Sequence, residues 1–203
     1  ITLYPASAVK AGQIVNPNIE PLQEDINEPE FMITDRRGNK IKITPVASYD
    51  IQARVAVSRN YPNYFSVVEL EDILTNDMAL VWGKFADKNI MKKIKFSHQW
   101  TYSGFSYRNE SLNQELGLDY LLKHFSSNHP VAANKNIDHA LRRVKKYDRI
   151  RMKGYLIDLE IPGLSPIKTS LVRTDNWIPG QGNTGGSEFI YVTELQIEDR
   201  IYR

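Results

Sequence analysis

Ser126, Ser127 and His129 are the residues whose types and spacing could do chemistry, because the run Ser126-Ser127-Asn128-His129-Pro130 places hydroxyl groups beside an imidazole. A serine whose proton is taken by a neighbouring histidine is a common nucleophile in hydrolases. No Gly-x-Ser-x-Gly elbow surrounds this run. The alternative is that Asn128 and His129 hydrogen-bond the backbone of a turn.

Three further residues could complete a site with Ser127 and His129. Arg173, Asp175 and Glu188 fall near the ends of expected strands, and paired carboxylates can serve as acid and base. A hydrolase requires these five side chains to converge around one pocket. The alternative is that the carboxylates are solvated at the surface.

The sequence indicates no metal and no cofactor. The four histidines, His98, His124, His129 and His139, do not have the spacing of a helical metal-binding motif, and the chain has no cysteine. The glycine-rich run 180–186 resembles a phosphate cradle, but it lacks the lysine of a P-loop and the strand-to-helix context. A hairpin connection is the expected structure there.

Composition indicates an ordinary globular protein. The chain has 203 residues, of which 41% are apolar and 25% charged, and the net charge is +2. This balance does not require nucleic acid or an anionic membrane as a partner, and the low mean hydropathy argues against a membrane span. Because the chain begins at Ile1, we expect that a signal or anchor segment has been removed ahead of it.

The elements that must position the candidate residues meet around the stretch 134–160, where a helical pattern passes into a strand pattern. Asn134 can cap a helix whose apolar residues, including Ile137 and Leu141, recur at three-and-four spacing. After Asp148 the apolar residues nearly alternate as far as Glu160, which is typical of a strand.

Periodicity and turn residues predict the other elements. Ser66 is expected to cap a helix that Gly83 ends, Asp87 to precede a second helix, and Pro45 and Pro130 to interrupt regular structure. A bend is expected at Gly104. The predicted strands span 31–34, 40–44, 49–58, 95–107, 149–160, 167–174 and 188–197, the predicted helices span 67–81, 88–94, 112–125 and 135–146, and 126–130 is predicted to be a connection.

The predicted architecture is α+β: a bent antiparallel sheet, or a small β-barrel, packed by two to four helices. Residues 1–30 contain four prolines and no sustained period, so they should form an extended arm. Residues 31–203 should form a single domain.

From Tyr49 onward the chain resembles an uncharacterised family of bacterial cell-envelope proteins, typically with a transmembrane segment ahead of a soluble domain. The stretches that carry the resemblance are 77–83, the aromatic run around Trp100, 127–129, 153–157, 170–175 and 186–188. Members usually have Cys where this chain has Ser187, and Asn-Met-His followed by an Ile-Pro-Ala-like stretch where it has residues 128–133. A shared thiol mechanism therefore does not carry over.

The resemblance implies a location, and it transfers no established activity. The expectation is a non-enzymatic binding or assembly module of the bacterial envelope, with a periplasmic soluble domain, another envelope protein as partner and membrane attachment only through an absent anchor. The alternatives are a hydrolase that uses the Ser/His run 126–129, and an oligonucleotide-binding barrel face carrying Trp100, Tyr102 and Tyr107. Nucleic acid is not the favoured partner, and the sequence does not indicate an oligomeric state.

Overall fold

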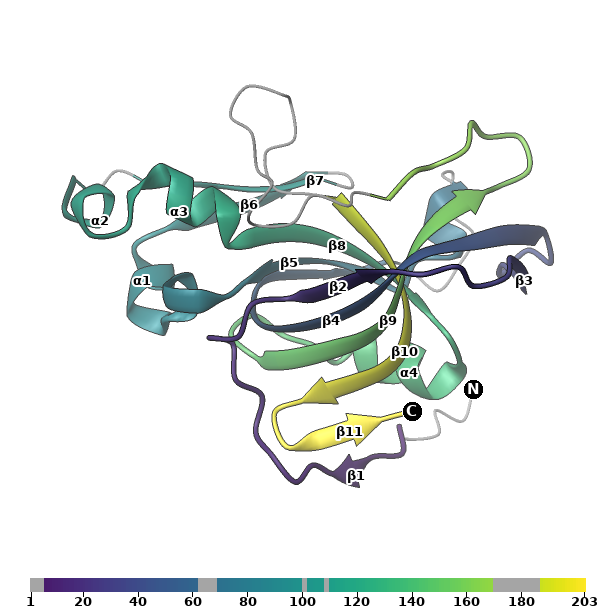
Figure 1. Ribbon diagram of the computed structural model, residues 1–203, viewed down its shortest axis with the longest axis horizontal. Helices are drawn as coiled ribbons and strands as arrows, with labels where there is room; N and C mark the ends of the chain where they lie inside the picture. The colour runs from purple at the N-terminus through teal and green to yellow at the C-terminus, as the bar shows by residue number, and fades with distance from the viewer. Residues whose placement is uncertain (1–5, 62–68, 100–101, 108–109, 170–186) are drawn as a thin grey trace.

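A large mixed β-sheet dominates the structure, with short helices at its periphery (Figure 1). The computed structural model describes residues 6–61, 69–99, 102–107, 110–169 and 187–203. The expectations for Ser66, Trp100, Arg173, Asp175 and the glycine-rich run 180–186 lie outside the described residues.

The strand β4 (Lys40–Asn60) is the longest element and organises the sheet. Its side chains alternate between buried and half-buried positions over most of its length, as a strand packed on one face requires. Pro45 does not end the strand, contrary to prediction. The pairing with β9 shifts register between Pro45 and Ala47, and such a bulge accommodates a residue that has no N–H to donate.

The sheet runs in the order β1-β11-β10-β8-β5-β4-β2, with β3 also on β4, and β9 bonded to both β10 and β4. The β8–β10 pair is parallel, so the expectation of a purely antiparallel sheet is wrong. The pairings β4–β5–β8–β10–β9–β4 form a closed circuit, but four further strands extend from it and the result is not a clean barrel. The strands of the sheet other than β4 are β1 (Val9–Lys10), β2 (Leu22–Asp25), β3 (Phe31–Thr34), β5 (Asn76–Val81), β8 (Phe125–Ala132), β9 (Arg149–Glu160), β10 (Ser187–Ile197) and β11 (Arg200–Tyr202).

The helix α4 (Lys135–Leu141) packs its apolar face onto the strands. Asn134 caps it, as predicted, with its side chain accepting a hydrogen bond from the Ile137 N–H. Ile137, Ala140 and Leu141 are fully buried in one cluster with side chains of β4, β5, β9 and β10. This cluster fills the inner side of the strand circuit.

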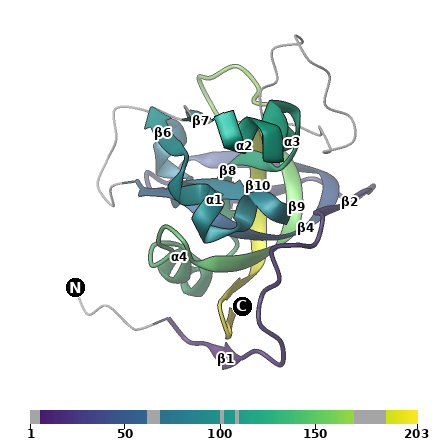
Figure 2. The same cartoon turned by 90° about the vertical axis from the view of Figure 1, so that its left-hand side faces the viewer.

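The helices α1 (Lys88–Lys92), α2 (Glu110–Glu115) and α3 (Gly117–Lys123) gather at one end of the sheet (Figure 2). Asp87 caps α1, in agreement with the prediction of a helix after it. The single helix predicted over 112–125 is instead two, because Gly117, the first residue of α3, has a φ of +74°.

The helix predicted over 67–81 is wrong. In the described part of this range, from Glu69 onward, a 3-10 turn, η1 (Glu69–Asp72), precedes the fully buried strand β5. A second 3-10 turn, η2 (Gly83–Ala86), follows. The apolar run of β5 is buried on both faces, which removes the alternation that distinguishes a strand from a helix.

A two-stranded hairpin covers the outer face of β5 and β8. The single bent strand predicted over 95–107 is two strands, β6 (Lys95–Gln99) and β7 (Tyr102–Ser106). Phe96 and Phe105 pack against a cluster that contains Ala79 and Phe125. Phe96, Phe105 and Tyr107 thus contribute to the core. The Trp100 and Tyr102 side chains, on which the expectation of a stacking platform depends, lie outside the described residues.

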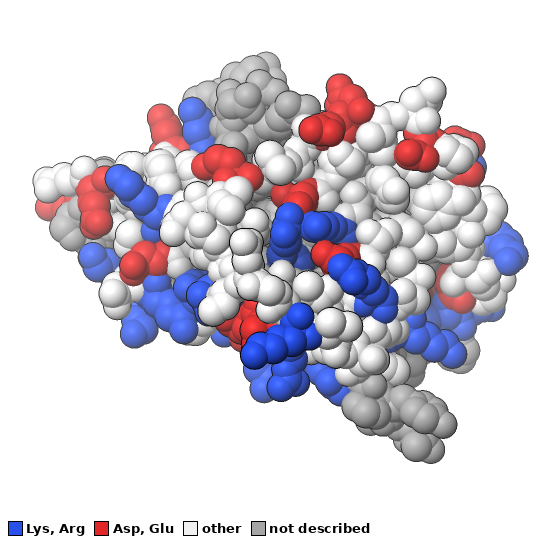
Figure 3. Space-filling view, turned by 60° about the horizontal axis from the view of Figure 1, so that its bottom comes forward, with Lys and Arg blue, Asp and Glu red and all other residues white. Residues whose placement is uncertain are grey.

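The N-terminal segment runs along the body of the molecule and contributes β1 and β2 to sheet edges. Hydrogen bonds tie it down, including Gly83 N–H to the Pro17 oxygen at 2.8 Å and Trp82 Nε1 to Glu20 Oε2 at 2.8 Å. Among the described residues, no helix has the length and apolar character needed to cross a membrane. On the face in Figure 3, Lys and Arg lie interspersed with Asp and Glu.

Candidate active site

The run Ser126–Pro130 is not the connection that its polar residues predict. It forms most of the strand β8, and all five of these residues are buried. Pro130 fits because β5 pairs with β8 only as far as Asn128, and the Pro130 oxygen still accepts from the Thr75 N–H at 3.2 Å. The serine and histidine side chains therefore project from a rigid, central strand.

Three adjacent strands bring Asp77, His129 and Ser187 together. Asp77 lies near the start of β5, which pairs antiparallel with β8. His129 is on β8, opposite Phe189 of the parallel strand β10, so that Ser187 at the start of β10 lies two positions away on the same face. The three residues are far apart in sequence and meet only through sheet pairing.

Their side chains form a continuous hydrogen-bonded array. His129 Nδ1 lies 2.5 Å from Asp77 Oδ1, and His129 Nε2 lies 2.8 Å from Ser187 Oγ. With Nδ1 protonated and donating to the carboxylate, Nε2 is free to accept the serine hydroxyl proton. This is the nucleophile, base and orienting acid arrangement of a Ser-His-Asp triad.

Asp77 is held by more than His129. The hydroxyl group of Tyr61 donates to Asp77 Oδ2, and His98 Nε2 lies 3.6 Å from the same oxygen. His98 comes from the hairpin strand β6 and is itself hydrogen-bonded through Nδ1 to Ser103 Oγ at 3.0 Å. Side chains from three separate parts of the chain thus surround the carboxylate, and Tyr61 and His129 hydrogen-bond to it.

The array runs from the interior to the surface. The Asp77 side chain is fully buried and that of His129 is 1% exposed, whereas Ser187 is exposed. Phe189 packs against the His129 ring with centroids 4.7 Å apart. A buried base and orienting acid behind an accessible hydroxyl suit a nucleophile that must meet a substrate.

The structure places the predicted site residues in different environments. His129 belongs to the array, while Ser127 Oγ is buried and has no hydrogen-bond partner among the described residues. Glu188 follows Ser187 on β10 and points to the opposite, inner face, near Tyr49 of the core. Arg173 and Asp175 lie outside the described residues.

Glu188 forms a separate polar site inside the sheet. Burial raises its pKa to about 8, although its own backbone N–H and the Ser126 hydroxyl donate to it and lower the pKa. Glu188 lies opposite Asn128 in register, and Glu188 Oε2 and Asn128 Oδ1 both lack a partner among the described residues. A proton on Glu188 would supply the donor that these two oxygens need.

Asp77, Tyr61 and Ser187 were not identified as site residues from the sequence. Asp77 falls within the helix that the sequence predicts over 67–81. One signal pointed to Ser187: the resemblance places a cysteine there, and Cys and Ser are the two residues that most often act as activated nucleophiles beside a histidine.

Among the described residues, no group of three or more His, Asp or Glu side chains could hold a metal ion. No protein-family model, curated protein or solved structure matches this chain.

Proposed function

We propose that the protein is a hydrolase or acyltransferase in which Ser187 is the nucleophile, His129 the general base and Asp77 the residue that orients the base. One observation carries this proposal: Ser187 Oγ, His129 and Asp77 form a hydrogen-bonded array with separations of 2.8 and 2.5 Å.

The array can perform both halves of an acyl transfer. Ser187 Oγ attacks a substrate carbonyl carbon while its proton passes to His129 Nε2, and the Asp77 carboxylate stabilises the resulting imidazolium. The imidazolium then gives that proton to the departing alcohol or amine. Water, deprotonated by the same nitrogen, releases the acyl group from Ser187 and restores the free hydroxyl.

A location in the bacterial envelope is a further part of the proposal, and the resemblance described above is its support. A non-enzymatic assembly role is the competing function, in which the same array would only stabilise the sheet. Fractionation of the native cell tests the location separately from the chemistry.

Hydrolysis of short p-nitrophenyl esters tests the chemistry. Ser187→Ala should reduce kcat/KM by at least about 100-fold, because loss of the nucleophile removes the covalent route. Ser127→Ala is the matched control, since Ser127 lies opposite Ser187 in register but its Oγ atom has no hydrogen-bond partner within the described part of the chain. Equal ester hydrolysis by Ser187→Ala and the parent protein would refute the proposal.

A further inference from the structure

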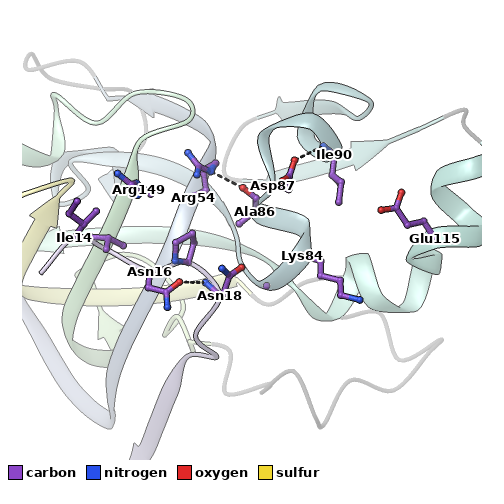
Figure 4. Close-up of a pocket in the computed structure, with 13 residues that line it drawn as sticks. Ile14, Asn16, Asn18, Arg54, Lys84, Ala86, Asp87, Ile90, Glu115 and Arg149 are labelled. Atoms are coloured by element: carbon purple, nitrogen blue, oxygen red, sulfur yellow. Dashed lines mark hydrogen bonds between the residues drawn. The ribbon is translucent and has the colours of Figure 1, made fainter.

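A cavity of about 640 Å³ lies between the N-terminal segment and one end of the sheet, and none of its lining residues belongs to the Ser187 array (Figure 4). Its walls come from residues 14–18, from η2 and α1, from Glu115 at the end of α2, and from Arg54 and Arg149 on β4 and β9. This volume is within the range of small-molecule sites in proteins.

Arg54 and Arg149 are direct cross-strand partners, which places two cations side by side. Arg149 is neutralised, because its Nε and Nη2 atoms donate to Glu198 Oε2 at 2.8 and 2.6 Å. Arg54 donates only to main-chain oxygens, from Nε to Ala86 at 2.7 Å and from Nη1 to Tyr147 at 2.9 Å. No hydrogen bond or ion pair joins Arg54 to a carboxylate among the described residues, although the charges of Glu198 and Asp87 lie near enough to act on its pKa. Its guanidinium therefore keeps donors for an anionic ligand.

The guanidinium of Arg54 is held in a fixed orientation by these two carbonyl groups. It is half-buried, and desolvation together with the nearby Arg149 lowers its pKa. An anion in the cavity would relieve both effects by pairing with the remaining Nη2 donors.

The cavity favours an anion with a single charge and an apolar body. Asp87, Glu115 and Lys84 also line the cavity, and the two carboxylates would repel a doubly charged phosphate more strongly than a singly charged carboxylate. Ile14, Pro17 and Ile90 supply apolar wall, and Ile14 is 59% exposed although hydrogen bonds fix its neighbours Gln13 and Asn16 to the body. An apolar ligand chain that covers this exposed isoleucine would remove apolar surface from water, which favours binding.

We infer that this cavity binds a small organic carboxylate with an aliphatic chain, with the carboxylate on Arg54 and the chain against Ile14 and Ile90. The site is independent of the proposed hydrolase activity.

Amide NMR titration with hexanoate tests this inference on the full chain. Hexanoate should shift the backbone amides of Asn18, Gly83 and Lys84 saturably, with millimolar affinity or tighter. Hexanamide, which lacks the charge, and inorganic phosphate, which lacks the chain, should each bind at least tenfold more weakly. Ser187→Ala should leave the hexanoate affinity unchanged.

Two variants locate the ligand. Arg54→Gln should lower the affinity for hexanoate at least fivefold. The matched control is Arg151→Gln, because Arg151 already pairs with Asp50. If Arg54→Gln does not fold, Ile14→Asp tests the site instead. Ile14→Asp should lower the affinity for hexanoate, while Ile19→Asp, at an exposed position outside the cavity lining, should leave it unchanged.

Three results would overturn the inference: no saturable shift in the parent protein, phosphate binding as tightly as hexanoate, or unchanged hexanoate affinity in folded Arg54→Gln or in Ile14→Asp.

Discussion

Ser187 and His129 are joined by a 2.8 Å hydrogen bond between two parallel strands, although 58 positions separate them in the chain. The parallel register sets this geometry, because it places Phe189 opposite His129 and thereby Ser187 beside the imidazole. A one-residue slip would turn the serine to the other face of the sheet. The site therefore depends on the strand pairing that also builds the core.

Asp77→Asn should reduce ester hydrolysis by about 10³- to 10⁴-fold, because an amide cannot stabilise the imidazolium and favours the wrong histidine tautomer. The Tyr61 hydroxyl can still donate to the amide oxygen, so the fold should persist by circular dichroism. Asp50→Asn, which removes the carboxylate partner of Arg151, is the control and should retain activity. Full activity in Asp77→Asn would show that the carboxylate has no role in the chemistry.

Ser187→Cys creates the only thiol in the chain and reports directly on its surroundings. His129 should lower the pKa of this thiol, so iodoacetamide at pH 6.5 should alkylate it at least about tenfold faster than the thiol of Ser106→Cys, an exposed position on β7. The advantage should disappear in the double variant that also carries His129→Ala. Equal alkylation rates for the two single-cysteine proteins would mean that His129 does not activate position 187.

Glu188→Gln should change how stability depends on pH. Burial raises the pKa of Glu188 to about 8 in the folded protein, whereas an exposed glutamate has a pKa of 4.5, so the folded state binds more protons between these pH values. Stability from this group is therefore greatest below pH 4.5 and falls as pH rises toward 8.

The Gln variant mimics the protonated carboxyl and should lack that decline. The difference in free energy of unfolding between the Gln variant and the parent protein should rise by about 3 to 5 kcal/mol from pH 5 to pH 9, since each tenfold change in proton affinity corresponds to about 1.4 kcal/mol. Urea denaturation at both pH values measures the difference. Parallel pH profiles for the two proteins would contradict a raised pKa at Glu188.

The local signals in the sequence were sufficient where the structure is set by neighbouring residues. The cap at Asn134, the helix after Asp87 and the neighbouring strands 31–34 and 40–44 were all predicted, because a side chain within three residues or a tight turn determines each of them.

The site could not be predicted in the same way. Residues 126–130 carry turn-forming types, yet strands β5 and β10 on either side impose an extended conformation on them. Asp77 is one acidic residue within an apolar stretch, and nothing local indicates that it will lie beside His129. Pairing between distant strands determines both the extended conformation of residues 126–130 and the position of Asp77. The periodicity of a single segment carries no information about such pairing.

Gly154→Ala should destabilise the fold by about 2 to 4 kcal/mol. A Cβ atom at position 154 would overlap the carbonyl oxygen of Tyr191, where β9 and β10 approach each other next to a register shift. Gly12→Ala is the matched control, since a Cβ there meets no atom within 4 Å. Thermal unfolding of both variants gives the comparison, and equal melting temperatures would show that the strands separate without cost.

Labelling with a fluorophosphonate tests the central claim most directly, because the reagent forms a stable bond only with an activated serine. The account predicts a single adduct by intact mass, mapped by peptide sequencing to Ser187 and absent from both Ser187→Ala and His129→Ala. No adduct on the folded protein, or an adduct at another serine that persists in Ser187→Ala, would contradict the assignment of Ser187, His129 and Asp77 as a catalytic triad.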